Sequence, residues 1–363
     1  MRRAAALIVG GGPAGSAAGI ALARAGISAE LIDRSAGPRD VVCGGFVGWD
    51  SLAALGRLGI DAAALGARPI GRLRLISGRD ILEARLPSPA AGLSRRRLDS
   101  ALLDAAEGAG VRVSRGRTAR AAEGPRCVRL EDGEEIEAEA LFLATGKHEL
   151  RGLARPLEGR IGEPAAGLRT ALPVGPDLAR ALGGFIELHL FDEGYAGLLL
   201  QEDGSANLCL SISRRRLGAA RGPEGLIEEL MKEAPLLAER IGGAAPETWE
   251  AVAGVPYGWR AQATGPGQFR IGDQAAVIAS LAGDGIAIAL TSGIAAAEAM
   301  SSGGPGAAPA FQREFARRAA RPVAVAERLR RSAESRRRRA FLLRLLKGLP
   351  MLVPLAARLT RIG

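Results

Sequence analysis

Three glycines near the N-terminus constrain the fold of this chain more than any other feature. They form a GxGxxG pattern, made by Gly10, Gly12 and Gly15. An apolar stretch over residues 4–9 precedes the pattern, and an Ala-rich stretch over residues 15–25 follows it. This order predicts a strand, a tight turn and a helix. In such a turn the first glycine permits the bend, the second lets the backbone approach a pyrophosphate, and the third packs the helix against the strand.

The residues around this turn complete a predicted dinucleotide site. Pro13 and Ala14 lie at the start of the predicted helix, whose N-terminal amides attract an anion. A second strand over residues 29–32 ends at Asp33, where a carboxylate can accept hydrogen bonds from a ribose, and Arg34 follows it. Glycine-rich turns and acidic strand ends also occur by chance, but the order of strand, turn and helix favours dinucleotide binding.

Length and hydrophobic patterning predict a second lobe. The chain has 363 residues, of which 47% are hydrophobic, so it can bury more than one core. Between residues 160 and 258, alternating stretches such as FIELHLF and ANLCLSI predict antiparallel strands, with Asp203-Gly204 as a hairpin turn. We therefore predict an α/β protein in which a Rossmann-like nucleotide-binding domain is joined to a second, largely antiparallel β-sheet domain.

Two later parts of the sequence narrow the choice of cofactor. One contains LSRRRLDSALLDAAEGAGVRV and then LFLATGKHE, and the other is FRIGDQAAVIASLAGDGIAIALTSG. Together with the N-terminal pattern, these segments resemble the FAD-dependent oxidoreductases of the geranylgeranyl reductase family, which share the para-hydroxybenzoate hydroxylase fold. The resemblance covers roughly residues 1–300 and implies that the bound dinucleotide is FAD.

The resemblance also implies how the chain divides. A discontinuous FAD-binding domain is expected from residues 1–65, 92–152 and 262–305. The substrate domain is expected from residues 66–91 and 153–261. The remaining residues, 306–363, are expected to form a basic C-terminal helical tail.

Two motifs in the first half match cofactor contacts of the family. Arg95 in SRRRLD matches an arginine that contacts the cofactor, although Arg96 or Arg97 can take that role and a solvated basic turn is the alternative. The second motif resembles the turn near the FAD adenosine and consists of Ala144, Thr145 and Gly146. Hydroxylases of this fold usually carry Asp where Thr145 stands, which weakens an NADPH-dependent hydroxylase interpretation.

Two motifs in the second half match contacts to the flavin itself. Gly272-Asp273 resembles the pair in which the carboxylate binds the ribitol, a charge-assisted hydrogen bond. The next motif is a loop opening a helix, formed by Gly283, Asp284, Gly285 and Ile286. The N-terminal dipole of that helix can stabilise negative charge on a reduced flavin ring.

Cys43 is the one thiol that the resemblance places near the flavin, because family members carry a similar Cys-Gly-Gly, and Gly44 follows it here. A buried structural cysteine is an equally weighted alternative. The other cysteines, Cys127 and Cys209, are distant in sequence, so we expect neither a redox disulfide nor a thiolate metal site. His148 and His189 are expected to be structural or solvated.

Charge is concentrated at the C-terminal end. Residues 312–363 contain 15 Lys and Arg against 3 Asp and Glu, so their net charge is +12 and the remainder of the chain carries −2. A basic extension on a near-neutral body predicts a membrane surface or an acidic partner rather than nucleic acid. The alternative is that the leucines within FLLRLLKGLPMLVPLAARL cap the protein's own core. Cysteine usage predicts a cytoplasmic protein, peripheral on the inner face of the membrane if the tail binds lipid.

These observations predict an FAD-dependent enzyme without a metal. A single GxGxxG leaves no second Rossmann domain, so NAD(P)H can serve only as a transient donor. The predicted reaction is hydride transfer between flavin and an isoprenoid or other lipid-like substrate, with reduction of a carbon-carbon double bond favoured. Two alternatives stay open: a monooxygenase acting on a phenolic or polyketide lipid, and a flavin-binding electron carrier.

Overall fold

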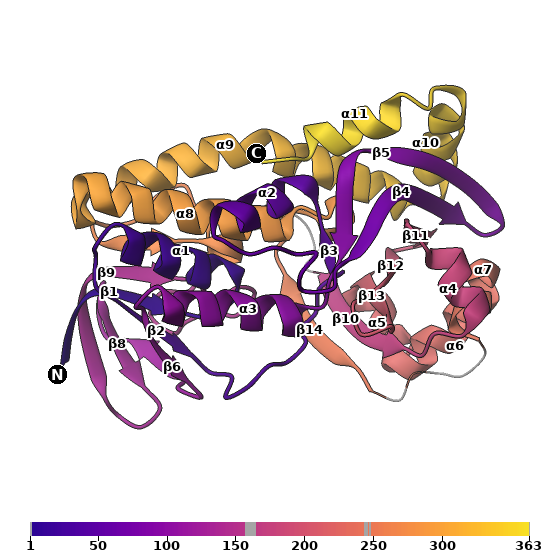
Figure 1. Cartoon of the computed structure of the whole chain (residues 1–363). Helices are drawn as coiled ribbons and strands as arrows, with labels where there is room; N and C mark the ends of the chain where they lie inside the picture. The colour runs from indigo at the N-terminus through magenta and orange to yellow at the C-terminus, as the bar shows by residue number, and fades with distance from the viewer. Residues whose placement is uncertain (1, 157–164, 243–245, 247, 363) are drawn as a thin grey trace.

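The structure is a computed structural model that describes residues 2–156, 165–242, 246 and 248–362. Residues 1, 157–164, 243–245, 247 and 363, which belong to the predicted domains and tail, lie outside the described residues. The chain forms two sheets side by side, with long C-terminal helices crossing both of them (Figure 1).

The first sheet has the strand order β6-β2-β1-β9-β8-β7, and β15 also pairs with β9. Its strands are β1 (Arg2–Val9), β2 (Ala29–Asp33), β6 (Arg112–Arg115), β7 (Ala119–Ala122), β8 (Cys127–Leu130), β9 (Glu135–Leu143) and β15 (Gln268–Arg270). β1 is parallel to β2 and β9, whereas β7, β8 and β9 form an antiparallel meander. Parallel pairing places the ends of β1, β2 and β9 at one edge of the sheet, where the predicted cofactor turns begin.

Four helices contribute to the core on one face of the first sheet. They are α1 (Pro13–Arg24), α2 (Trp49–Arg57), α3 (Arg95–Gly108) and α8 (Gly285–Gly303). Strand alternation separates two cores: Ala6 and Ile8 pack with these helices, whereas Leu7 and Val9 pack with β8 and β9 residues on the other face. α1 and α8 approach closely because Gly293 of α8 lies against the backbone of Ala14.

The second sheet has the strand order β14-β10-β13-β12-β11-β4-β5-β3. Its strands are β3 (Phe46–Val47), β4 (Arg68–Ser77), β5 (Asp80–Gly92), β10 (Ala165–Leu172), β11 (Phe185–Phe191), β12 (Gly194–Leu200), β13 (Ala206–Ser213) and β14 (Glu250–Val255). All neighbours are antiparallel except β11 and β4. Gly204, with φ +84°, turns the predicted hairpin between β12 and β13.

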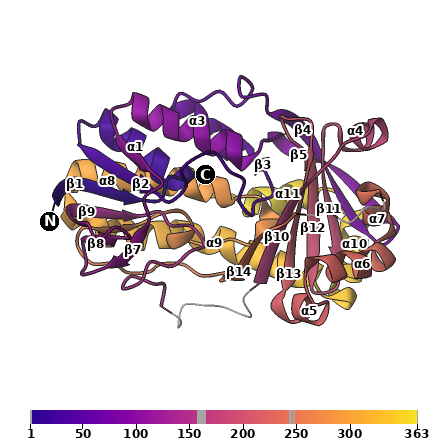
Figure 2. The same ribbon diagram turned by 90° about the horizontal axis from the view of Figure 1, so that it is seen from below.

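Short helices cover the outer face of the second sheet (Figure 2). They are α4 (Pro176–Leu182), α5 (Arg214–Ala219), α6 (Pro223–Glu233) and α7 (Pro235–Ile241). Alternation again sorts side chains: Leu198 and Leu208 pack outward with these helices, and Tyr195 and Cys209 face the inside of the molecule.

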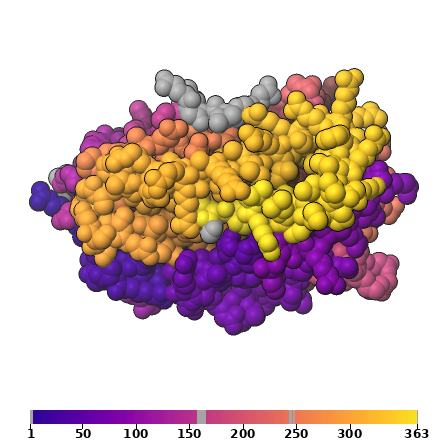
Figure 3. All heavy atoms as spheres, turned by 90° about the horizontal axis from the view of Figure 1, so that it is seen from above, coloured from indigo at the N-terminus to yellow at the C-terminus, as the bar shows by residue number. Residues whose placement is uncertain are grey.

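The basic C-terminal segment is part of the body of the molecule. It forms α9 (Ala308–Ala333), α10 (Arg336–Gly348) and α11 (Leu352–Leu359). The described residues before it include the short 3₁₀ helices η2 (Gly272–Gln274), η3 (Ser280–Ala282) and η4 (Pro305–Ala307). Figure 3 shows α9 to α11 spread over one face as a continuous surface. Their inner sides pack on α8, on β15 and on the leucines of the second sheet.

Candidate functional site

A cavity of about 770 Å³ runs between the two sheets. One end is the edge of the first sheet, where the turns after β1, β2 and β9 meet. The other end lies against the inner face of the second sheet and beneath α9, α10 and α11. The cavity therefore joins the predicted dinucleotide site to the predicted substrate sheet.

The glycines of the first turn have separate roles. Gly10 has φ +109°, and a Cβ there would collide with the carbonyl of Ala144. A Cβ on Gly15 would collide with the carbonyl of Gly10, so Gly15 packs helix on strand and does not line the cavity. Gly12 borders open space, because a Cβ added there would have only Arg95 Nη2 as a neighbour, at 3.4 Å. No side chain caps α1 and no acid lies in its first turn, so its amides face the cavity, where Pro13 and Ala14 also lie.

Asp33 and Arg34 form the wall next to this turn. The carboxylate of Asp33 accepts hydrogen bonds from the backbone N–H of Gly11 at 2.6 Å and of Ser35 at 2.7 Å. Each oxygen keeps a second lone pair for a hydroxyl in the cavity. Arg34 Nη2 lies 2.7 Å from Nε2 of His148, which is exposed and lines the cavity as well.

Among the three arginines of SRRRLD, Arg95 is the one that lines the cavity. Its guanidinium forms two hydrogen bonds of 2.7 Å to Asp99, one turn further along α3. Ser94 caps the helix by accepting the N–H of Arg97. Arg96 is exposed and pairs with Asp203 outside the cavity.

The turn after β9 and the Gly272-Asp273 pair are held together. Gln274 donates hydrogen bonds to the carbonyls of Gly146 at 3.1 Å and His148 at 2.9 Å. Ala144, Thr145 and Gly146 line the cavity there, as Gly272 and Asp273 do.

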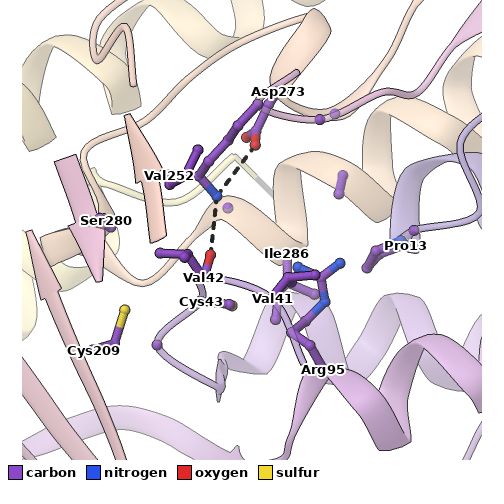
Figure 4. Close-up of a pocket in the computed structure, with 18 of the residues that line it drawn as sticks. Pro13, Val41, Val42, Cys43, Arg95, Cys209, Val252, Asp273, Ser280 and Ile286 are labelled. Atoms are coloured by element: carbon purple, nitrogen blue, oxygen red, sulfur yellow. Dashed lines mark hydrogen bonds and ion pairs between the residues drawn. The ribbon is translucent and has the colours of Figure 1, made fainter. Parts of the chain in front are cut away.

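Lys147 crosses between two walls of the cavity. Its Nζ lies 3.6 Å from Oδ2 of Asp273 and 3.4 Å from the carbonyl of Val42, the two interactions dashed in Figure 4. Burial disfavours its positive charge, but the Asp273 carboxylate, together with Cys43 and Tyr257, outweighs burial and raises the pKa of Lys147 above its ordinary value. Lys147 is therefore a fixed cation at this point.

Cys43 lies on the loop between β2 and β3 and lines the cavity with Gly44. The amide of Asn207 donates to the Cys43 carbonyl at 3.0 Å, and Arg169 in turn donates to Asn207 at 2.8 Å. Cys209 of β13 lines the same cavity (Figure 4), so a second thiol is present that the spacing in sequence did not reveal. Burial raises the pKa of Cys209 to about 12, which keeps it protonated.

At the second sheet, the exposed Ser280 joins three buried hydroxyl side chains, those of Tyr195, Tyr257 and Ser211, into a chain. Ser280 Oγ bonds to the hydroxyl of Tyr195 and, at 2.7 Å, to that of Tyr257. Ser211 Oγ lies 3.3 Å from the same Tyr257 hydroxyl. Burial raises the pKa of both tyrosines, so they stay neutral and able to donate a proton.

Beyond the hydroxyl chain the cavity is apolar. Strand residues form one wall, namely Leu73, Leu75, Leu86, Ile186, Leu188 and Leu190. Helix residues form the roof, namely Ala326, Leu329, Ala333, Leu342, Leu346, Val353, Ala356 and Ala357. We refer to this part as the apolar chamber. It can hold a hydrocarbon without unsatisfied polar groups.

The sequence matches the FAD binding domain family over residues 3–152. A menaquinone reductase of Mycobacterium tuberculosis is 30% identical over 379 residues, which cover 98% of this chain and 87% of that protein. This chain belongs to the family of FAD-binding oxidoreductases that includes the menaquinone reductases.

Two solved structures share the fold of this oxidoreductase. A geranylgeranyl bacteriochlorophyll reductase-like protein from Thermoplasma acidophilum has 18% identity and a TM-score of 0.76, over 92% of this chain and 88% of that chain. A probable FAD-dependent monooxygenase from Pseudomonas aeruginosa has 17% identity and a TM-score of 0.73, over 94% and 100%. At this identity the likeness shows the fold alone, and it confirms the predicted para-hydroxybenzoate hydroxylase class.

The oxidoreductase has the groups that FAD requires. Uncapped amides of α1 face a pyrophosphate position, and Gly12 leaves the space beside them open. Gly44 and Gly285 have no atom within 4 Å of a built Cβ, which leaves room for a flat ring. The predicted cofactor is therefore confirmed as FAD by the family and fits the cavity.

The side chain of Asp284 does not support its expected role in the loop that opens α8. Gly283, Gly285 and Ile286 line the cavity, whereas Asp284 is fully buried and points away from it. Its carboxylate accepts hydrogen bonds from Arg361 at 2.8 Å and from the N–H of Ile362 at 3.0 Å. Asp284 does lie in the loop that opens α8, as the motif predicts, but the residues that bind its side chain belong to the C-terminal end.

Four functional candidates were missed by sequence reasoning. Lys147 directly follows the ATG turn, a signal that could have been used. Tyr195, Tyr257 and Cys209 carry no local motif, because strands and loops distant in sequence bring them together. Within the described residues, no group of three His, Cys, Asp or Glu side chains is placed to hold a metal.

Proposed function

We propose that this chain reduces a carbon-carbon double bond of an isoprenoid lipid, with a quinone of the menaquinone type as the favoured substrate class. The supporting observation is the apolar chamber, which continues the FAD cavity under α9 to α11. The name of the M. tuberculosis relative supports a lipid quinone, and the T. acidophilum neighbour supports the geranylgeranyl reductase type of chemistry.

When bound, FAD supplies a hydride to one carbon of the double bond, and the other carbon requires a proton. The hydroxyl chain of Tyr195, Ser280 and Tyr257 lies where the polar cavity meets the apolar chamber. We assign proton donation to Tyr195, because it is neutral and lies among the chamber leucines. Asp273 and Lys147 hold the cofactor end, and the chamber orients the substrate and excludes water.

The remaining parts of the proposal concern the electron donor and the location of the protein in the cell. One GxGxxG leaves NAD(P)H as a transient donor that docks at the cavity mouth. Because the proposed substrate is a lipid, we place the protein at the cytoplasmic face of a membrane.

Anaerobic single-turnover experiments test this function. The FAD-loaded protein is reduced with NADH, NADPH or dithionite and mixed with a short-chain menaquinone analogue, while flavin absorbance and product mass are followed. Flavin reoxidation is expected, with a product that still carries two added hydrogens in its isoprenoid side chain after its ring has been reoxidised to the quinone. Tyr195→Phe should slow this step about 100-fold without changing FAD content. Reoxidation only after air is admitted, without a reduced product, contradicts the proposal.

A monooxygenase acting on a phenolic lipid is the second candidate, favoured by the fold shared with the P. aeruginosa protein. The same experiment in air distinguishes it, because product would gain one oxygen atom and oxygen uptake would match substrate. An electron carrier without a substrate is disfavoured by the deep apolar chamber at the ring end of the cavity.

A further inference from the structure

The exposed large hydrophobic side chains of the described residues gather in one place. Five belong to α10, α11 and the turn between them, namely Phe341, Leu345, Leu349, Met351 and Leu355. Phe341 and Met351 are 69% and 73% exposed. The sixth, Ile81, lies at the tip of the β4–β5 hairpin, which the ion pair between Lys347 and Asp80 joins to α10. We call these six residues the apolar rim.

Positive charge surrounds the apolar rim. Residues 335–362 contain eight Arg or Lys and no Asp or Glu. Six of the eight are exposed: Arg336, Arg337, Arg338, Arg344, Lys347 and Arg358. The other two are used inside the body, since Arg339 pairs with Asp192 and Arg361 with Asp284. An exposed apolar face bordered by cations matches an anionic lipid surface.

The opposite sides of the same helices form the roof of the apolar chamber. On α10, Leu342 and Leu346 line the chamber, whereas Phe341 and Leu345 are exposed one position earlier. On α11, Val353 lines the chamber. Since neighbouring helix positions are rotated by about 100°, one turn of α10 faces both the chamber and the outside.

Neither helix crosses a membrane by itself. α10 and α11 are long and apolar enough to span one only as a pair, and that pair is bent by 117°. α8 passes alone, but 56% of its apolar window is buried in the body, as in a core helix. A bent, basic, amphipathic pair is suited to lie in the interface of one leaflet.

We propose that α10 and α11 dock on the surface of an anionic bilayer through the apolar rim, and that this roof is the entrance through which a membrane lipid reaches the chamber. The entrance rests on the proposed function, whereas docking does not. A second copy of the chain is a less suitable partner for the rim, because two such surfaces would bring twelve exposed cations together.

Vesicle flotation tests the docking. The FAD-loaded full chain is mixed at low salt with phosphatidylcholine vesicles that contain or lack phosphatidylglycerol. Wild type should float with the anionic vesicles only. The triple variant Arg336→Gln, Arg337→Gln, Arg338→Gln should weaken binding about 100-fold, and the double variant Phe341→Ser, Met351→Ser about tenfold or more.

A matched triple variant controls for charge alone. Arg3, Arg112 and Arg120 are exposed on β1, β6 and β7, strands that lie at the end of the molecule opposite α10 (Figures 1 and 2), and their change to Gln should leave flotation unaltered. Equal loss in this control, or no flotation of wild type, overturns the docking. So does a dimer that Phe341→Ser, Met351→Ser converts to monomer, because the rim would then be a contact between copies.

Activity separates docking from function. The docking variants should retain FAD and wild-type reduction of a short-chain soluble quinone, but lose most reduction of a long-chain quinone placed in anionic vesicles. Full activity on the vesicle substrate without binding overturns the entrance. Wild type that floats but reduces neither quinone leaves docking supported and contradicts the proposed function.

Discussion

Gly12 and Gly15, both in the turn after β1, differ in how much space an added methyl group would find. Gly15 faces the backbone of Gly10, whereas Gly12 faces the cavity and has ordinary extended φ and ψ angles of −71° and −175°. A side chain at Gly12 therefore costs the fold little and occupies the pyrophosphate position.

Gly12→Val should reduce FAD affinity on the order of 100-fold while the apoprotein keeps its thermal midpoint, because within the protein the added bulk meets only the end of the Arg95 side chain. Gly15→Ala should lower the midpoint of the apoprotein itself. Fluorescence titration with FAD and calorimetry of both apoproteins measure this. Unchanged FAD affinity of the Gly12 variant would show that the cofactor does not pass this turn.

Lys147 is the cation that joins the Asp273 wall to the Val42 wall. Lys147→Met should leave Asp273 without this partner and weaken FAD binding about 10- to 150-fold, which corresponds to the ~1.5–3 kcal/mol of one hydrogen bond to a charged group. Lys147→Arg keeps the charge and should restore most of the affinity. Equal affinity of wild type and the Met variant would assign Lys147 no part in holding the cofactor end.

At the scale of elements, the contact between α1 and α8 fixes the helices that lie on the first sheet. Gly293→Ala would drive a methyl group into the carbonyl of Ala14, so the helices must separate. We expect a loss of about 1–3 kcal/mol in the free energy of unfolding. Gly56→Ala in α2 is the matched control, because nothing lies within 4 Å of its built Cβ, and it should be neutral or slightly stabilising. Urea unfolding of both variants checks the difference.

Another element-scale feature is a buried charge cluster between β11 and α7. Burial alone would raise the pKa of Glu187, but hydrogen bonds from His189, Arg240 and Arg74 outweigh it and lower the pKa to about 2. The carboxylate is fully buried and lies on the outer face of the second sheet, away from the cavity. The cluster therefore links acid stability to the second sheet.

Because the pKa of Glu187 is lower in the folded chain than its usual 4.5, its ionisation stabilises the fold above about pH 4.5. This contribution, about 3 kcal/mol, is lost as pH falls from about 4.5 to about 2. Glu187→Gln should be less stable than wild type at pH 7 and lose less stability over that acid range. Urea unfolding at several pH values measures it, with exposed Glu239→Gln as control. Parallel acid profiles for wild type and Glu187→Gln would contradict the assignment.

At the scale of the whole molecule, the cavity shows which parts of a site a sequence reveals. The Gly12 turn and Asp33 were predictable, because strand, turn and helix are contiguous and their spacing is set by local geometry. The hydroxyl chain was not, since Tyr195 and Ser280 meet only when the second sheet packs against the first domain. The side-chain partner of Asp284 was not predictable for the same reason, because Arg361, near the other end of the sequence, donates a hydrogen bond to its carboxylate.

The fold class was predictable for a similar physical reason, since alternating and periodic patterns report buried faces one element at a time. Those patterns do not show what lies against each side of a helix that has apolar residues on both sides. The leucines of α10 supported either core packing or a lipid surface, and the structure gives some of them to each side: Leu346 is buried and Leu345 is exposed.

The position of the chamber roof along the chain has a consequence for biosynthesis. The Gly12 turn leaves the ribosome first, and α11, which closes the chamber, follows more than 300 residues later. At about 5–20 residues per second, the nascent chain spends on the order of tens of seconds with the first βαβ unit made and the chamber leucines uncovered. The chamber leucines therefore stay uncovered until the helices of the roof have been made.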